Sequence, residues 1–212
     1  MSEVLEQIAT MLQKGKRKDV AKLCQQAIDE GIDANEVLTK GLLAGMDVVG
    51  AKFKANEIFV PQVLVSARAM KAGSEVLKPY LAGENTTGKG KVVIGTVQGD
   101  LHDIGKNLVI MMFEGKGFEV IDLGVDVSPE KFIQTAIDEN CDIIGLSALL
   151  TTTMPVMGEV VKAAEEAGIR DRVKIMVGGA PVTQEFADSI GADAYTEDAP
   201  SAAEKALELL AG

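Results

Sequence analysis

The chain has 212 residues, of which 47% are apolar and 25% charged, a composition typical of a globular protein with a buried core. Its formal net charge is −11, which argues against a nucleic-acid-binding surface because such surfaces need clustered lysine and arginine. No stretch approaches the roughly 20 consecutive apolar residues that cross a bilayer, and the first residues lack the basic and apolar regions of a secretory signal. We therefore expect a cytoplasmic protein that binds neither nucleic acid nor a membrane.

The first part of the chain, residues 1–82, has apolar residues at helical spacing. Four such patterns predict four helices with short connections, which form a bundle, at about 4–12, 20–28, 34–53 and 60–81. Gly31 is expected to end the second helix, because glycine readily adopts the left-handed conformation found at helix ends. The third helix contains Gly41, Gly45 and Gly50, each of which lowers helix stability by about 1 kcal/mol. These glycines favour close helix packing or the close approach of a ligand.

The segment 83–90 is polar, rich in glycine and without periodicity, which is typical of a linker. From residue 91 to 212, short apolar runs alternate with helical patterns. The runs predict five buried strands, at 92–97, 118–123, 142–147, 173–177 and 193–195. The helical patterns lie near 105–116, 129–139, 154–168, 183–190 and 199–210. This alternation predicts an α/β domain with a Rossmann-like (flavodoxin-like) five-stranded parallel sheet, of strand order 2-1-3-4-5 and preceded by the four-helix bundle as a cap.

The loop after the first predicted strand contains His102, the only histidine in the chain. In a sheet of this order, ligands bind beyond the carboxyl ends of the first and third strands, so this loop lies at the expected site. Asp100 and Asp103 flank the histidine, and a carboxylate commonly holds one imidazole nitrogen while the other nitrogen binds a metal. Zinc would need further histidines or paired cysteines as ligands. A single histidine suits a metal whose other positions a macrocycle fills, which leaves haem or corrin.

The loop after the third predicted strand has four hydroxyl side chains within seven residues, from Ser147 to Thr153. Hydroxyls donate and accept hydrogen bonds, so they fit a polar part of a ligand, but they also fit the capping of a helix that starts near Pro155. Gly178 and Gly179 follow the fourth strand. They would let a bulky ligand approach the backbone, and they fit an ordinary turn equally well.

The two cysteines, Cys24 and Cys141, lie far apart and lack the spacing of a metal site. Each lies within or beside an apolar run, so both are expected to be buried structural thiols.

Taken together, the loop residues resemble the cobalamin-binding signature D-x-H-x-x-G, S-x-L and G-G. The matching residues are Asp100, His102 and Gly105, then Ser147 and Leu149, then Gly178 and Gly179. The segments 48–53 and 59–63 also resemble the helical cap of methyl-carrying corrinoid modules. Over nearly its whole length, the chain is therefore similar to the corrinoid methyl-carrier proteins of methylamine, methanol, betaine and aryl-ether methyltransferase systems, and to the cobalamin module of methionine synthase.

The resemblance implies a cobalamin or related corrinoid, bound base-off and His-on, with His102 as the cobalt ligand. Asp100 would hold the other imidazole nitrogen, and Thr153 would complete the relay, although methionine synthase has a different hydroxyl residue at that position. Other cofactor contacts are expected from the same loop, namely from Gly99, Leu101, Asp103 and Gly105. Leu149 is also expected to contact the cofactor. Ser147 and Thr151 are expected to contact the nucleotide tail, and its tunnel is expected to be lined by Gly178, Gly179, Ala180 and Ala199. Phe53 and Val60 would cover the upper face of the corrin, where methionine synthase has leucine at the second position.

The function that the resemblance implies is methyl transport without turnover by the chain alone. The expected partners are a substrate-specific methyltransferase, a second methyltransferase that acts on a thiol or tetrahydrofolate acceptor, and a reductive activating protein. Three alternatives stay open: a cobalamin-binding subunit of an adenosylcobalamin mutase, a cobalamin-dependent sensor, and a flavodoxin-like domain that binds flavin. The net charge favours solubility, or docking to a basic partner surface.

Overall fold

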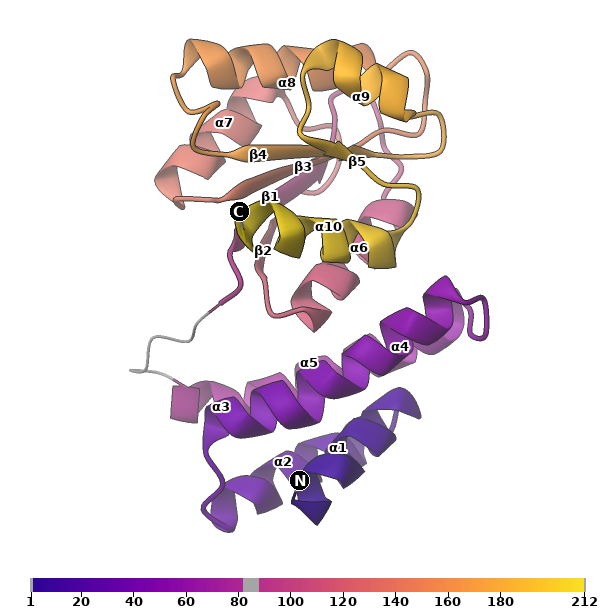
Figure 1. The fold of residues 1–212 in the computed structure, drawn as a ribbon, viewed down its shortest axis with the longest axis vertical. Helices are drawn as coiled ribbons and strands as arrows, with labels where there is room; N and C mark the ends of the chain where they lie inside the picture. Colours follow the sequence, from indigo (N-terminus) through magenta and orange to yellow (C-terminus); the bar gives the residue numbers. More distant parts are fainter. Residues whose placement is uncertain (1, 82–87, 212) are drawn as a thin grey trace. The chain divides into compact units, whose positions relative to one another are not determined.

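The computed structural model describes residues 2–81 and 88–211, which belong to two compact units divided between Thr87 and Gly88 (Figure 1). The greater part of the predicted linker 83–90 lies outside the described residues, so the exact domain limits stay a prediction. Within the described residues, no helix is long and apolar enough to cross a membrane.

The first unit is a bundle of helices, as predicted. Its elements are α1 (Glu3–Gln13), α2 (Arg17–Asp29), the continuous segment α3 (Ala34–Glu36), η1 (Val37–Leu43) and α4 (Ala44–Lys54), and finally α5 (Val60–Leu81). All four helical segments contribute fully buried side chains to its centre, among them Leu5, Ile8, Leu12, Val20, Leu42 and Leu77. Gly31 follows the end of α2 with φ +81°, and the N–H of Ile32 closes the last turn on the carbonyl of Ala27 at 3.0 Å.

The third helical segment differs from the prediction in one respect, since η1 is a π-helix within it. Four of its buried residues, Val37, Gly41, Gly45 and Val49, recur at every fourth position, and Leu42 and Met46 are buried beside them. A spacing of four drifts around a helix of 3.6 residues per turn, and the wider π turn offsets this drift. The glycines serve close helix packing, because an added Cβ would lie 3.1 Å from Ile8 Cγ2 at Gly41 and 3.1 Å from Ala9 Cα at Gly45.

The second unit is the predicted α/β domain. Its strands are β1 (Lys91–Thr96), β2 (Glu119–Asp122), β3 (Ile143–Ser147), β4 (Lys174–Gly178) and β5 (Ala194–Tyr195). They form a parallel sheet in the predicted order β2-β1-β3-β4-β5. The helices are α6 (Ile104–Gly115), α7 (Pro129–Asp138), α8 (Pro155–Glu166), α9 (Gln184–Ile190) and α10 (Ala199–Ala211). Figure 1 shows α6 and α10 on one face of the sheet and α7, α8 and α9 on the other.

The sheet brings the predicted site together at the carboxyl ends of its strands. Strand β1 is buried along nearly its whole length, which explains its unbroken apolar run. In the observed register, Thr96 at the end of β1 pairs with Ser147 of β3, and Ser147 pairs with Gly178 of β4. The loops that follow these three strands therefore meet at one edge of the sheet.

Candidate cofactor-binding site

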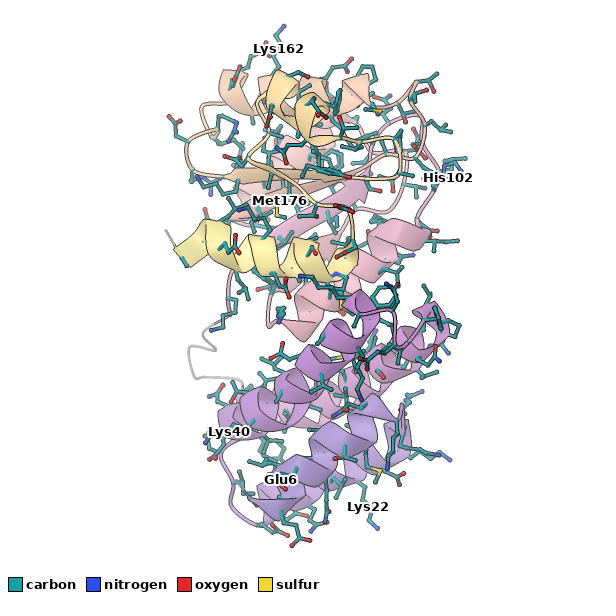
Figure 2. The ribbon with its side chains drawn as sticks, turned by 45° about the vertical axis from the view of Figure 1, so that its right-hand side comes forward. Glu6, Lys22, Lys40, His102, Lys162 and Met176 are labelled. Carbon is teal, nitrogen blue, oxygen red and sulfur yellow. The ribbon has the colours of Figure 1, made fainter. Side chains whose placement is uncertain are left out.

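His102 lies in the loop between β1 and α6, and it is oriented by hydrogen bonds rather than by packing. Its side chain is 51% exposed, and Figure 2 shows it at the surface of the α/β unit, directed away from the sheet. The ring Nδ1 lies 2.7 Å from Oδ1 of Asp100, and the backbone N–H of His102 donates to the same oxygen at 3.1 Å. The carbonyl of His102 accepts a hydrogen bond of 2.8 Å from the buried Thr96 hydroxyl.

Asp100 is fully buried, and its carboxylate is surrounded by hydrogen-bond donors. Its second oxygen, Oδ2, accepts from the backbone N–H of Leu149 at 2.7 Å and from that of Leu150 at 3.2 Å. Desolvation raises the pKa of this carboxyl, but the hydrogen bonds from the His102 ring, the two backbone groups of Leu149 and His102, and the Thr153 hydroxyl outweigh it and hold the pKa well below its usual range. The carboxylate is therefore ionised at neutral pH.

The charge of Asp100 determines which nitrogen of His102 is free. An ionised carboxylate only accepts hydrogen bonds, so Nδ1 of His102 must donate. In a neutral imidazole, Nε2 then has the lone pair that a metal binds. Since Nδ1 is directed toward the buried carboxylate and half of the side chain is exposed, the Nε2 edge of the ring faces outward.

Thr153 provides the third member of this arrangement from the loop before α8. It is nearly buried, and its hydroxyl lies 2.9 Å from Asp100 Oδ2 and 2.9 Å from the carbonyl oxygen of Leu150. A hydroxyl has a single proton, so it donates to one of these oxygens at a time. Thr153 can therefore make or break its hydrogen bond to Asp100 by rotating the hydroxyl alone, without a movement of the rest of the side chain.

Asp103, the other carboxylate beside the histidine, has a different environment. It is exposed at the start of α6, and its Oδ2 accepts a hydrogen bond from the Asn107 side chain at 3.2 Å. The geometry thus places Asp100, which the resemblance favoured, and not Asp103 against the imidazole ring.

The donor set fits a metal that needs a single protein ligand. In the part of the chain that the structure describes, no group of three or more histidine, cysteine, aspartate or glutamate side chains could hold a metal ion. Cys24 and Cys141 are free and buried, and burial raises the pKa of Cys24 to about 12 and that of Cys141 to about 11, as expected for structural thiols. A macrocycle that occupies the other metal positions satisfies this chemistry, whereas zinc does not.

Exposed apolar side chains accompany His102. Leu101 on the same loop is 70% exposed, and Ile104, the first residue of α6, is 74% exposed. Leu149 and Leu150 are about two-fifths exposed on the loop that binds Asp100. Large apolar side chains gathered at a surface commonly indicate a binding site. They suit the flat apolar edge of a macrocycle around the histidine.

The residues expected around the nucleotide tail follow β3 and β4 at the same edge of the sheet. Ser147 and Gly178 are paired in register and partly buried, Thr151 and Ala180 are exposed, and Ala199 is buried at the start of α10. Gly179 has φ +135°, and a Cβ there would overlap the carbonyl oxygen of Ala148. That glycine is required by the approach of two protein backbones, so it needs no ligand to explain it.

Two other glycines have no such explanation within the fold. At Gly178 the nearest atom to an added Cβ is the Thr196 carbonyl oxygen at 3.7 Å, an ordinary contact, and at Gly105 no described atom lies within 4 Å. Open space at both positions fits the close approach of a ligand. Gly99 differs again, since its φ of +84° favours glycine for conformational reasons.

Phe53 and Val60 belong to the helical unit, where both are partly buried. Their expected role over the upper face of the corrin stays a prediction.

The structure also adds residues that the sequence analysis did not identify. Thr96 and Asp126 hold the backbone of the His102 loop, and Ile104 and Leu150 extend its exposed apolar surface. The position of Asp126 after the second strand, at the carboxyl edge of the sheet, was an available signal. The exposure of Ile104 and Leu150 could not be predicted from the sequence, because large apolar residues are more often buried.

A buried carboxylate that directs one half-exposed histidine, at the switch point of a doubly wound sheet, is the arrangement expected of a protein that binds a metal macrocycle. Comparisons with known proteins agree with this class. Residues 90–206 match a family described as B12 binding domain, and residues 4–78 match a second family with the same description. The chain belongs to the family of corrinoid proteins with B12 binding domains.

Individual relatives extend over the whole chain. Dimethylamine corrinoid protein 1 of Methanosarcina acetivorans is 45% identical over 210 residues, which are 99% of this chain and 98% of that protein. Trimethylamine corrinoid protein 1 of the same organism is 46% identical over 192 residues, 90% of this chain and 89% of that protein. The solved methanol:cobalamin methyltransferase complex of Methanosarcina barkeri includes a chain that is 34% identical, with a TM-score of 0.92, covering 100% of this chain and 81% of that one.

Proposed function

We propose that this chain carries a methyl group on the cobalt of a bound corrinoid, between a substrate-specific methyltransferase and a second methyltransferase that acts on a thiol or tetrahydrofolate acceptor. The observation that carries the proposal is the His102 ring, held at Nδ1 by the buried Asp100 and open at Nε2. The likeness to corrinoid proteins for dimethylamine and trimethylamine, and to a methanol:cobalamin methyltransferase complex, supports it.

In this proposal the corrinoid is bound base-off and His-on, and its cobalt supplies the atom that accepts and donates the methyl group. His102 would provide the axial nitrogen, and Asp100 would keep the ring in the tautomer that leaves Nε2 unprotonated. A carboxylate in this position also raises the basicity of the histidine. Thr153 would respond to the charge on Asp100 by rotating its O–H group, so that the hydroxyl donates either to Oδ2 of Asp100 or to the Leu150 carbonyl oxygen.

The remaining residues would bind and shield the cofactor. The exposed leucines and Ile104 would exclude water below the corrin. Phe53 and Val60 would shield the upper face of the corrin. The nucleotide tail would be contacted by Ser147 and Thr151 and lined by Gly178, Gly179, Ala180 and Ala199. Tail binding would keep the cofactor attached whenever His102 releases cobalt, so ligand exchange would not lead to cofactor loss.

The chain would have no turnover alone, because the groups that select the methyl donor and activate the acceptor are expected on partner proteins. A reductive activating protein would restore the cofactor after oxidation. The mutase alternative is less well supported, since the relatives that extend over both units include corrinoid proteins for dimethylamine and trimethylamine and a chain of a methanol:cobalamin methyltransferase complex.

A methyl-transfer assay tests the proposal. The reduced holoprotein is paired with candidate methyltransferases and a panel of donors, including mono-, di- and trimethylamine and methanol. We expect methylation of the bound corrinoid with at least one pair, and none when either the donor or its methyltransferase is omitted. A holoprotein that contains an adenosyl corrinoid and supports a radical rearrangement would contradict the proposal and favour the mutase subunit.

A further inference from the structure

The loop between β2 and α7 holds the His102 loop through one residue, Asp126. Its Oδ1 accepts a hydrogen bond from the backbone N–H of Gly99 at 2.7 Å. Its own backbone N–H donates to the carbonyl oxygen of Asp100 at 3.0 Å. One residue thus holds a backbone group of each of two neighbouring residues, Gly99 and Asp100, shortly before His102.

The conformation of Asp126 is unusual for a residue with a side chain. Its φ is +55°, in the left-handed region that most residues avoid and that aspartate and asparagine tolerate better than most. In this conformation both its amide and its carboxylate are directed to the Gly99–Asp100 segment.

Asp126 itself stands on a rigid frame. On one side, the N–H of Thr96 donates to the Gly124 carbonyl at 2.9 Å, and on the other the N–H of Val127 donates to the Thr96 carbonyl at 3.0 Å. Val97 and Val127 form a parallel bridge beyond the strands. The β2–α7 loop therefore continues the pairing of the sheet up to Asp126.

This frame matters because packing alone does not place the histidine. Half of the His102 side chain is exposed, so its ring position depends on the Asp100 carboxylate and hence on the Asp100 backbone. Binding sites of this kind need their groups held to within about 0.5 Å. A contact that fixes the backbone of Asp100 therefore also fixes the position of Nε2 of His102, because the Asp100 carboxylate holds the ring.

We infer that Asp126 is a positioning residue for the axial histidine, acting through the Gly99–Asp100 backbone; the inference rests on the proposed role of His102 as cobalt ligand. Asp126 does not touch the ring, and its carboxylate acts as a hydrogen-bond acceptor rather than through its charge.

Two substitutions separate these contributions. Asp126→Asn keeps a side-chain oxygen that can accept from Gly99 and tolerates the left-handed backbone, but it removes the charge. Asp126→Gly adopts the same backbone without strain and removes the acceptor. The full-length variants and the wild type are labelled with nitrogen-15 at histidine, reconstituted with hydroxocobalamin and reduced to cobalt(II). The nitrogen-15 splitting in electron paramagnetic resonance then gives the ratio of histidine-bound to histidine-free cobalt, because the nitrogen of the cofactor's own base is unlabelled.

We expect Asp126→Asn to stay within about twofold of wild type and Asp126→Gly to lower the ratio roughly tenfold, the lower end of the effect seen for partners that orient metal-bound histidines. A wild-type ratio in Asp126→Gly would overturn the inference. An equal loss in both variants would overturn it as well, since charge and not the bond to Gly99 would then be responsible.

Hydrogen exchange in the cofactor-free protein gives a second reading that does not depend on corrinoid binding. Asp126→Gly should speed exchange of the His102 amide several-fold relative to Asp126→Asn, while urea unfolding shows that both variants fold. If the wild type shows no histidine-bound cobalt, the proposed function has failed, and the amide exchange alone decides whether Asp126 positions the loop. Equal exchange in the two variants would then contradict the inference.

Discussion

The side chain of His102 is half exposed, whereas the carboxylate that orients it is fully buried among hydrogen-bond donors. Burial of an ionised carboxylate is unfavourable unless every oxygen is satisfied. Asp100 meets this condition with two backbone N–H groups of the opposite loop, the His102 N–H and ring, and Thr153. The arrangement gives the exposed ring a fixed tautomer in a site that remains open to a large ligand.

Replacement of Asp100 by asparagine tests the proposed relay. The amide removes the negative charge that supports His102 as a donor, and loss of such a partner commonly changes metal affinity 10–100-fold. We expect the methyl-corrinoid spectrum of Asp100→Asn to shift toward the histidine-free form, and that of Thr153→Ala to shift in the same direction by less. Spectra of both variants that match wild type would exclude the relay.

A substitution at Gly105 tests corrinoid binding without a loss of stability. It is exposed at the start of α6 with open space around it, so Gly105→Ala should leave the free energy of unfolding unchanged or raise it by up to about 1 kcal/mol. If the corrin approaches this backbone, the added methyl group should weaken corrinoid binding at least several-fold. Equilibrium titration with methylcobalamin and urea unfolding of the cofactor-free protein measure the two effects, and wild-type affinity would show that the cofactor lies elsewhere.

The sequence identified His102 and both candidate carboxylates, because a lone histidine at a switch point is conspicuous. Spacing alone did not separate Asp100 from Asp103, because the difference depends on contacts with Leu149 and Leu150, about fifty positions away, and only the resemblance favoured Asp100. Asp126 was missed, although its position after the second strand placed it at the same edge of the sheet. Its role follows from backbone contacts that form only when the sheet is assembled.

At the scale of helices and strands, the agreement is closest in the α/β unit. Buried parallel strands are apolar on both faces, so they appear in the sequence as unbroken runs bounded by turn residues. The sequence analysis did not predict the π-helical segment η1. Its wider turn accompanies the close packing of Gly41 and Gly45 on α1, a tertiary contact that local sequence preference does not indicate.

The packing of η1 and α4 on α1 predicts different outcomes for two similar substitutions. A Cβ at Gly45 would meet the backbone of Ala9, which cannot move easily, so Gly45→Ala should destabilise the bundle by about 1–3 kcal/mol despite the better helix propensity of alanine. At Gly41 the neighbour is the Ile8 side chain, which can adjust, so Gly41→Ala should be closer to neutral.

Urea unfolding followed by labelling of the buried Cys24 in α2 reports on the bundle alone. If the two alanine variants lose the same stability, the α1 backbone does not set the limit at Gly45.

At the scale of the whole molecule, each unit contains one buried thiol, Cys24 in the bundle and Cys141 before β3. Burial raises the pKa of both thiols, to about 12 and about 11, so at pH 8 they are protonated and should react only when their unit opens. The two labelling rates therefore measure the stability of the two units separately.

Methylcobalamin, added in the dark, should slow the labelling of Cys141, by about 100-fold at a ligand concentration 100 times its Kd. Cys24 should also be protected if Phe53 and Val60 contact the cofactor as the resemblance implies. Protection of Cys141 alone would confine the site to the α/β unit, and protection of neither thiol would contradict corrinoid binding by the folded chain.

The central claim is that His102 binds the cobalt of a corrinoid. The most direct measurement uses the full chain labelled with nitrogen-15 at histidine and reconstituted with hydroxocobalamin. Bound cobalt is determined, and electron paramagnetic resonance of the cobalt(II) form identifies histidine on cobalt by its nitrogen-15 splitting. The wild type and a control, Lys162→Ala, which alters an exposed side chain on α8, should bind about one cobalt per chain and show nitrogen splitting from histidine. His102→Ala should lose the nitrogen splitting and bind cofactor more weakly, and an unchanged signal with unchanged cobalt content would contradict the assignment.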